Sequence, residues 1–159
     1  MLEHKISLNQ DGFAFIEVFI RPFSSLAVQP IEFKVDSGAN RTTISSRFLF
    51  ALGYDINWIK QGKRLEGIER PTLASGLAVE DCYRVVLPEI QIGEWVGYNW
   101  PILTCLSQSF KFLFGTDSMQ FFDWHFEYGR MQCRYELVPG KRKMLFNRLE
   151  QSIHSVDEC

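Results

Sequence analysis

The sequence predicts an all-β fold, either a β-barrel or a sandwich, with one or two short helices. The chain has 159 residues, 14 of them Phe, and aromatic side chains fit the half-buried surface of a β-sheet. Short apolar runs, several of which alternate with polar residues, are separated by Gly, Pro, Asp and Asn residues that favour turns. We therefore expect about seven or eight short strands.

The N-terminal part is expected to form a hairpin and a third strand. Residues 5–9 and 13–21 are apolar runs on either side of an Asp-Gly pair, which is a strong hairpin signal because both residues accept positive φ. Residues 31–36 then alternate between apolar and charged side chains with a period of two, as a half-buried strand does. This strand ends on the acidic residue Asp36.

A short helix follows. Ser45 or Ser46 can cap a helix over residues 47–52, and Gly53 is placed to end it. Residues 65–71 are typical of a strand that runs into a turn rich in Gly and Pro.

The next strands are expected further along the chain. Residues 83–92 form a strand in which Pro88 indicates an edge or a bulge, and residues 95–106 are another apolar segment. Residues 112–114 are expected to form a short buried strand that is closed by a turn at residues 115–117.

The C-terminal part predicts a second hairpin and a helical tail. Residues 123–128 and 131–137 lie on either side of a Gly-Arg turn. Residues 141–156 are expected to form an amphipathic helix, whose apolar side chains are Met144, Leu145, Leu149 and Ile153.

Size and charge exclude several classes of protein. We expect one domain over residues 1–159, with a core at about 5–137 and a tail at about 141–156. Charged side chains sum to 17 − 19 = −2, which does not favour nucleic acid or an anionic membrane as a partner. No apolar run approaches the ~20 residues of a membrane span, and Glu17 interrupts the early apolar run that a signal peptide would need. We therefore expect a cytoplasmic location.

The four cysteines are expected to be free thiols in a reducing compartment, because none are spaced as a metal site or a dense disulfide framework. No phosphate-binding, dinucleotide-binding or zinc-protease motif occurs, so neither a metal nor a cofactor is expected.

One segment could carry chemistry. Asp36 is delivered from the end of a strand onto the turn Ser37-Gly38-Ala39, where Gly38 allows the backbone to bend tightly. A carboxylate used for general acid–base catalysis must be held by such a rigid backbone. The alternative interpretation is an Asx-type turn with no function beyond local structure.

Together, this turn and a later segment resemble the retropepsin-like aspartic proteases. Residues 36–39 are similar to the D-[ST]-G-A active-site motif of that family. Residues 112–117 resemble its second signature, which has two or three apolar residues, Gly, any residue and then Asp or Asn. The similarity extends over residues 31–137, and residues 65–72 lie where the family places its flap hairpin.

The resemblance implies a closed β-barrel that carries half of an active site. The chain has a single D-[ST]-G motif, whereas a peptidase of this family needs two aspartates that share a proton. The expected enzyme is therefore a homodimeric aspartic endopeptidase with Asp36 of each protomer as a catalytic residue and a peptide or protein as substrate.

The resemblance also implies roles for the neighbouring residues. Ser37, Gly38 and Ala39 would form the active-site loop. Ser37 would form a hydrogen bond across the dimer axis, and Gly38 would leave room for the substrate backbone and offer it a carbonyl. Gly67 and Ile68 would form the tip of the flap.

Gly115 and Asp117 would support the active-site loop, with Arg41 as a possible partner of Asp117.

Two other functions stay open. Glu69, Arg70 and Pro71 make the expected flap poor in glycine, so the chain could be a catalytically silent dimeric binding module. Basic residues near Phe and Trp could instead bind single-stranded nucleic acid, although the net charge of −2 opposes this.

Overall fold

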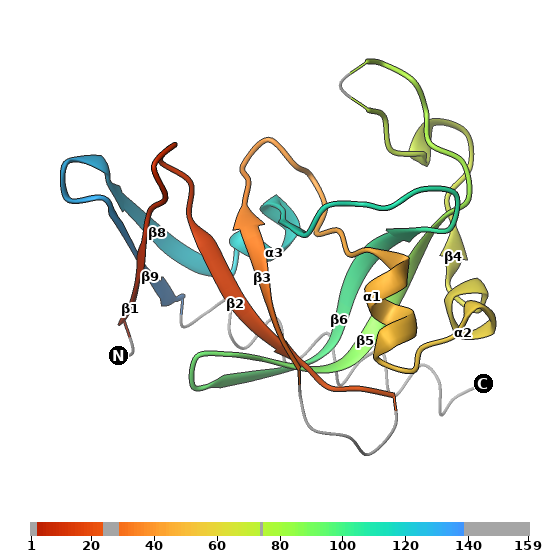
Figure 1. The fold of residues 1–159 in the computed structure, drawn as a ribbon, viewed down its shortest axis with the longest axis horizontal. Coiled ribbons are helices and arrows are strands. Elements are labelled where there is room, and N and C mark those ends of the chain that lie inside the picture. The colour runs from red at the N-terminus through yellow and green to blue at the C-terminus, as the bar shows by residue number, and fades with distance from the viewer. Residues whose placement is uncertain (1–2, 24–28, 74, 139–159) are drawn as a thin grey trace.

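The protein is built from two open β-sheets with short helices (Figure 1). The computed structural model describes residues 3–23, 29–73 and 75–138. The first sheet has the order β1-β9-β8, formed by β1 (Glu3–Ser7), β9 (Gln132–Leu137) and β8 (Phe122–Glu127). The second has the order β4-β5-β2-β3-β7, formed by β4 (Lys63–Arg64), β5 (Cys82–Ile92), β2 (Phe15–Ile20), β3 (Gln29–Val35) and β7 (Leu113–Phe114), with β6 (Trp95–Cys105) paired to β5.

The predicted β-rich class is confirmed, but the predicted closed barrel is wrong. The strands at the two ends of the larger sheet, β4 and β7, are each two residues long and do not pair with each other. The first strand, β1, pairs with β9 in the separate three-stranded sheet. Both sheets therefore keep open edges.

The first predicted hairpin is correct in its turn and wrong in its strand pairing. Leu8 bridges Ala14, and the side chain of Asn9 accepts hydrogen bonds from the backbone N–H groups of Asp11 and Phe13 at 3.0 and 2.9 Å. Beyond this turn the two strands separate, because β1 pairs with β9 whereas β2 pairs with β3 and β5. A turn signal fixes only the local reversal of the chain.

Period-two alternation positions the core correctly. In β2 the side chains of Ile16, Val18 and Ile20 are fully buried, and in β3 Phe33 is fully buried. The larger hydrophobic cluster contains all four of these residues. A second, smaller cluster lies apart from it and is formed by Leu65, Val79, Cys82, Leu103 and Cys105.

Within the described residues, three α-helices and two 3-10 helices connect the strands: α1 (Ser46–Ala51), α2 (Ile56–Lys60), α3 (Thr116–Met119), η1 (Gly67–Glu69) and η2 (Tyr128–Arg130). The predicted helix corresponds to α1, and Gly53 follows it with a φ of 91° that favours glycine. The prediction missed α2, whose cap is the side chain of Asp55 accepting from the backbone N–H of Trp58 at 2.8 Å.

The long β5–β6 hairpin is irregular at Pro88, but the predicted edge or bulge is wrong, because β5 pairs with strands on both sides and its register with β6 does not shift. The ladder pairs Leu87 with Trp100 and Glu89 with Tyr98, so the pair between them is missing while the register is unchanged. Asn99, which lies opposite Pro88, has a φ of 53°. The later hairpin is confirmed as β8 and β9. The predicted C-terminal helix lies outside the described residues.

Cysteine chemistry in the described part of the chain agrees with the expectation of free thiols. Cys82, Cys105 and Cys133 are buried and unbridged, and Cys82 pairs with Cys105 across β5 and β6. Burial raises the pKa of the Cys82 thiol to about 12, and it also raises the pKa of Cys133. The reactive species is the thiolate, so Cys82 and Cys133 are poor nucleophiles in the folded protein.

A Cys159→Ser variant tests this conclusion. At pH 8 its remaining thiols should react with iodoacetamide at least about 100-fold more slowly in the native protein than in denaturant, since all three are buried away from the reagent. Because the folded pKa of Cys82 lies above its unfolded value, stability should fall as pH rises above roughly 8.5. Rapid labelling of the native variant, followed by mass spectrometry, would contradict the assignment.

Candidate active site

Asp36 is the first residue after β3, and backbone hydrogen bonds hold it there. β3 and β7 are parallel, with Val35 opposite Phe114, and the N–H of Asp36 donates to the carbonyl of Phe114 at 3.1 Å. The N–H of Gly38 donates to Oδ1 of Asp36 at 2.9 Å, and the N–H of Ala39 donates to the Asp36 carbonyl at 3.1 Å. The Asx-type turn is therefore present, and it orients a partly exposed carboxylate.

Gly38 contacts this carboxylate closely. A Cβ atom at position 38 would lie 3.1 Å from Oδ1 of Asp36. Ser37 is exposed beside it and makes no hydrogen bond within the described part of the chain. The turn thus presents one carboxylate and one free hydroxyl at the surface.

A second loop packs directly against the Asp36 turn at Gly115. The N–H of Thr116 donates to the carbonyl of Ala39 at 2.9 Å. A Cβ atom on Gly115 would lie 2.6 Å from the carbonyl oxygen of Arg41 and 2.9 Å from that of Ala39. Only glycine allows the two backbones to approach this closely.

Asp117 joins the two loops through Thr42. The Thr42 N–H donates to Oδ2 of Asp117 at 3.1 Å, and the Thr42 hydroxyl donates to Oδ1 at 2.8 Å. The N–H of Ser118 also donates to Oδ1, at 2.8 Å. Arg41 was the expected partner of Asp117, and this expectation is wrong: their charged groups form no ion pair within the described residues.

These contacts continue into a buried chain of hydrogen bonds that has one direction. The indole N–H of Trp100 donates to Oγ of Ser118 at 3.0 Å, and Oγ of Ser118 lies 2.6 Å from Oγ1 of Thr42. Because the Thr42 hydroxyl gives its only proton to Asp117, Ser118 must be the donor to Thr42. Thr42 also accepts from the N–H of Gly115 at 3.2 Å. Every hydroxyl is satisfied, so the network strongly favours one arrangement of the two loops.

Ser118 and Trp100 had no recognisable signal in the sequence. Ser118 lies in a helix of four residues, and Trp100 lies on β6. Their side chains meet Thr42 only because the fold brings α3, β6 and the loop after β3 together.

The segment between β4 and β5 projects from the body as an arm (Figure 1). The arm is defined here as residues 65–73 and 75–81. The predicted flap tip, Gly67 and Ile68, lies in the 3-10 helix η1. The turn of the arm is instead at its far end, where Thr72 bridges Ala78 and the N–H of Leu73 donates to the carbonyl of Leu77 at 2.9 Å. The prediction therefore placed the tip too early in the chain.

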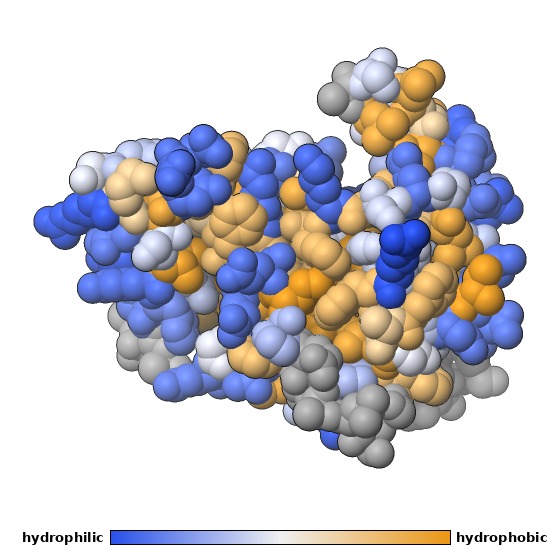
Figure 2. All heavy atoms as spheres, viewed as in Figure 1, coloured by the Kyte–Doolittle hydropathy of each residue, from blue (hydrophilic) through white to orange (hydrophobic). Residues whose placement is uncertain are grey.

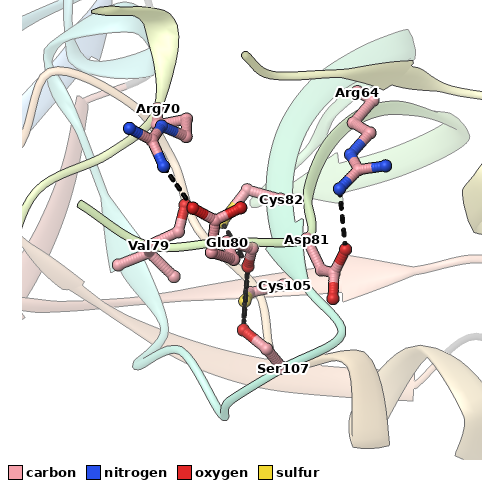
Figure 3. Close-up of polar contacts among 8 residues, drawn as sticks. All are labelled: Arg64, Arg70, Val79, Glu80, Asp81, Cys82, Cys105 and Ser107. Carbon is pink, nitrogen blue, oxygen red and sulfur yellow. Dashed lines mark hydrogen bonds and ion pairs between the residues drawn. The ribbon is translucent and has the colours of Figure 1, made fainter. Parts of the chain in front are cut away.

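Ion pairs and backbone contacts hold the base of the arm (Figure 3). Arg70 pairs with Glu80, and Arg64 pairs with Asp81 at 3.2 Å. The hydroxyl of Ser107 donates to the carbonyl of Glu80 at 2.8 Å. Beneath these contacts lies the smaller hydrophobic cluster, so the base is anchored while the end projects.

The arm exposes apolar side chains next to a hollow in the surface (Figure 2). Ile68 is fully exposed, and Leu73 and Leu77 are also exposed. In the same view, the loop after β3 lies on the opposite side of this hollow (Figures 1 and 2). Exposed apolar groups of this kind are suited to covering an apolar partner.

The described residues contain no group of three or more His, Cys, Asp or Glu side chains that could hold a metal ion. They also contain no helix of the length and apolar character needed to cross a membrane.

The fold is similar to that of a solved aspartic protease. The crystal structure of a retropepsin-like aspartic protease from Rickettsia conorii matches with a TM-score of 0.61 and 19% sequence identity, over 84% of this chain and 89% of that chain. No family model and no curated protein sequence matches the chain. The likeness at this identity concerns the fold.

Replacing Thr42 with Val should destabilise the protein. The change keeps the shape of the fully buried side chain but leaves Oδ1 of Asp117, the N–H of Gly115 and the hydroxyl of Ser118 each short of one partner. We expect the free energy of unfolding to fall by about 1–3 kcal/mol, measured by urea denaturation. Thr43→Val is the control, because Thr43 donates at 2.7 Å to the carbonyl of Lys111 at a more exposed site. Equal losses for the two variants would show that the network has no special role.

Proposed function

We propose that this protein is an aspartic endopeptidase that acts as a homodimer, with one Asp36 from each protomer. The observation that carries the proposal is the pair of interlocked loops, in which a partly exposed Asp36 carboxylate is oriented by Gly38 and supported by Gly115 and Asp117. The retropepsin-like fold supports the same reaction class.

The need for a dimer follows from chemistry. Hydrolysis by this mechanism uses two carboxylates so close together that they cannot both ionise and instead share one proton. The sequence contains a single Asp-Ser-Gly motif, so one chain provides one of the two acids. A two-fold axis beside the exposed face of the loop would bring two copies of Asp36 together.

The proposed reaction begins with one Asp36 ionised and the other protonated. The ionised carboxylate takes a proton from water while the water oxygen attacks the peptide carbonyl carbon, and the protonated carboxyl donates its proton to the carbonyl oxygen. The resulting tetrahedral diol collapses, the carbon–nitrogen bond breaks, and the amine leaves with a proton from the dyad. The pair titrates as a unit with two macroscopic pKa values.

Neighbouring groups have supporting roles in this proposal. Ser37 would form its hydrogen bond across the axis, and Gly38 would leave room for an extended substrate backbone. Ile68 and the apolar end of the arm would cover the substrate and exclude water. The substrate would be an extended peptide segment bound through its backbone and apolar side chains.

Asp36→Asn should abolish hydrolysis without loss of the fold. The amide cannot act as a base, so we expect kcat/KM on a peptide library between pH 4 and 7 to fall at least about a hundredfold. The control is Asp11→Asn, which removes a carboxylate from an exposed turn. Sedimentation should show a dimer for both variants. Retained activity in Asp36→Asn would remove this residue from the mechanism, and a dimeric wild type that cleaves nothing would favour the silent binding module.

Mixing the two proteins tests whether the site is shared. When wild type and Asp36→Asn are combined in equal amounts and allowed to exchange subunits, about a quarter of the dimers contain two wild-type chains. The activity should therefore fall to about half of that of the same amount of wild type alone. Unchanged activity after exchange, with mixed dimers verified by mass spectrometry, would show that each chain carries a complete site.

A further inference from the structure

A second concave site lies beside the candidate active site. It is a cavity of about 430 Å³, lined by four parts of the chain. Asn40 and Arg41 contribute from the loop that carries Asp36, Arg84 comes from β5, Trp100 comes from β6, and Gln120 and Phe121 are the two residues that follow α3. None of the residues proposed to act on the scissile bond lines this cavity.

The cavity carries two arginines that lie outside the ion pairs of the described residues. Arg41 and Arg84 are exposed and form no ion pair among the described residues. By contrast, the described arginines that do form ion pairs are Arg21, Arg64, Arg70, Arg130 and Arg134. Two guanidinium groups in one hollow repel each other, so a ligand that neutralises them would be bound favourably.

The one acid that lines the cavity does not serve as that ligand. Asp117 already accepts three hydrogen bonds, two from Thr42 and one from Ser118. The charged side chains of the lining sum to 2 − 1 = +1, whereas the whole chain has a net charge of −2. The site is therefore locally positive on an acidic protein, and it disfavours basic ligands.

The remaining lining suits a peptide side chain. Trp100 and Phe121 are buried aromatic walls, and Asn40 and Gln120 are exposed amides. A carboxylate matches the planar geometry of a guanidinium group and can accept two hydrogen bonds from it. A Glu or Asp side chain therefore fits this lining, because its carboxylate can bind the two arginines while its methylene groups contact the aromatic side chains.

Arg41 lines the cavity and its charge also acts on the arm. Arg41 lies two residues after Ala39 in the sequence, and its positive charge acts on Glu69 in the arm. Lys63 lowers the pKa of Glu69 through a hydrogen bond and its charge, and Arg41 adds a smaller effect in the same direction. Because the loop that carries Asp36 also lines the cavity through Arg41, a peptide bound at this loop can reach the cavity.

We propose that this cavity is an acid-selective recognition site, in which Arg41 and Arg84 bind a Glu or Asp side chain of the substrate away from the scissile bond. The assignment rests on the proposed function for the nature of its ligand. In this proposal, selectivity for the substrate side chain comes from Arg41 and Arg84 in the cavity, whereas hydrolysis depends on Asp36 in the turn.

The test measures binding apart from hydrolysis. The probes are fluorescein-labelled octapeptides with two central Phe residues and Gln elsewhere, in which each Gln is replaced in turn by Glu. Fluorescence anisotropy with the Asp36→Asn protein should show that Glu at one or two positions lowers Kd by about tenfold relative to the all-Gln peptide. Adding Arg84→Gln should remove this preference and leave the all-Gln affinity unchanged.

Arg47→Gln is the matched control. Arg47 is an exposed arginine of α1 that forms no ion pair among the described residues and does not line the cavity. The preference for Glu should survive this change. Circular dichroism would verify that all variants are folded. Absence of any preference for Glu, or an equal loss in Arg47→Gln and Arg84→Gln, would overturn the assignment.

The outcomes separate this inference from the proposed function. Cleavage of the all-Gln peptide by wild type, with no effect of Glu at any position on binding, would overturn the recognition site alone. A preference for Glu that Arg84→Gln removes, with no cleavage of any probe by dimeric wild type, would support the recognition site and overturn the peptidase.

Discussion

The close approach of two loops is the constraint on which the rest of the structure depends. Gly115 lies so near the backbone of Ala39 and Arg41 that no side chain fits between them. The Thr42–Asp117 contacts then lock the loops together, and Ser118 and Trp100 tie them to the core. A carboxylate at the end of a strand would otherwise move with its turn. Here the turn is joined by hydrogen bonds to a second loop and, through that loop, to a buried network.

This rigidity contrasts with the arm opposite. The base of the arm is held by ion pairs at Arg64 and Arg70 and by the smaller hydrophobic cluster, whereas Ile68 and Leu77 are exposed. Exposed ion pairs contribute little stability, so the packed cluster is the stronger anchor. A rigid loop thus lies across the hollow from an arm that is anchored at its base and apolar at its end (Figures 1 and 2).

Local patterns predicted the elements better than their partners. The alternation in β2 and β3 and the glycine after α1 were sufficient to locate those elements, because each depends on neighbours within a few residues. The Asp-Gly turn is also present, but β1 does not pair with β2 beyond it. It pairs instead with β9, which lies more than a hundred residues later in the chain. The tip of the arm was misplaced because η1 interrupts the segment that was taken as a strand.

The sequence by itself determined the chemistry available at the site: a single acid on a tight turn, a glycine that admits a close approach, and a second acid after it. The tertiary structure alone decided which side chains hold these loops in place. Asp117 accepts a hydrogen bond from Thr42, which lies 75 residues earlier in the chain, and Ser118 of α3 accepts one from Trp100 of β6. The same folding placed Arg41 and Arg84 in one cavity. Turns follow from the preferences of adjacent residues, whereas these contacts depend on how distant strands pack.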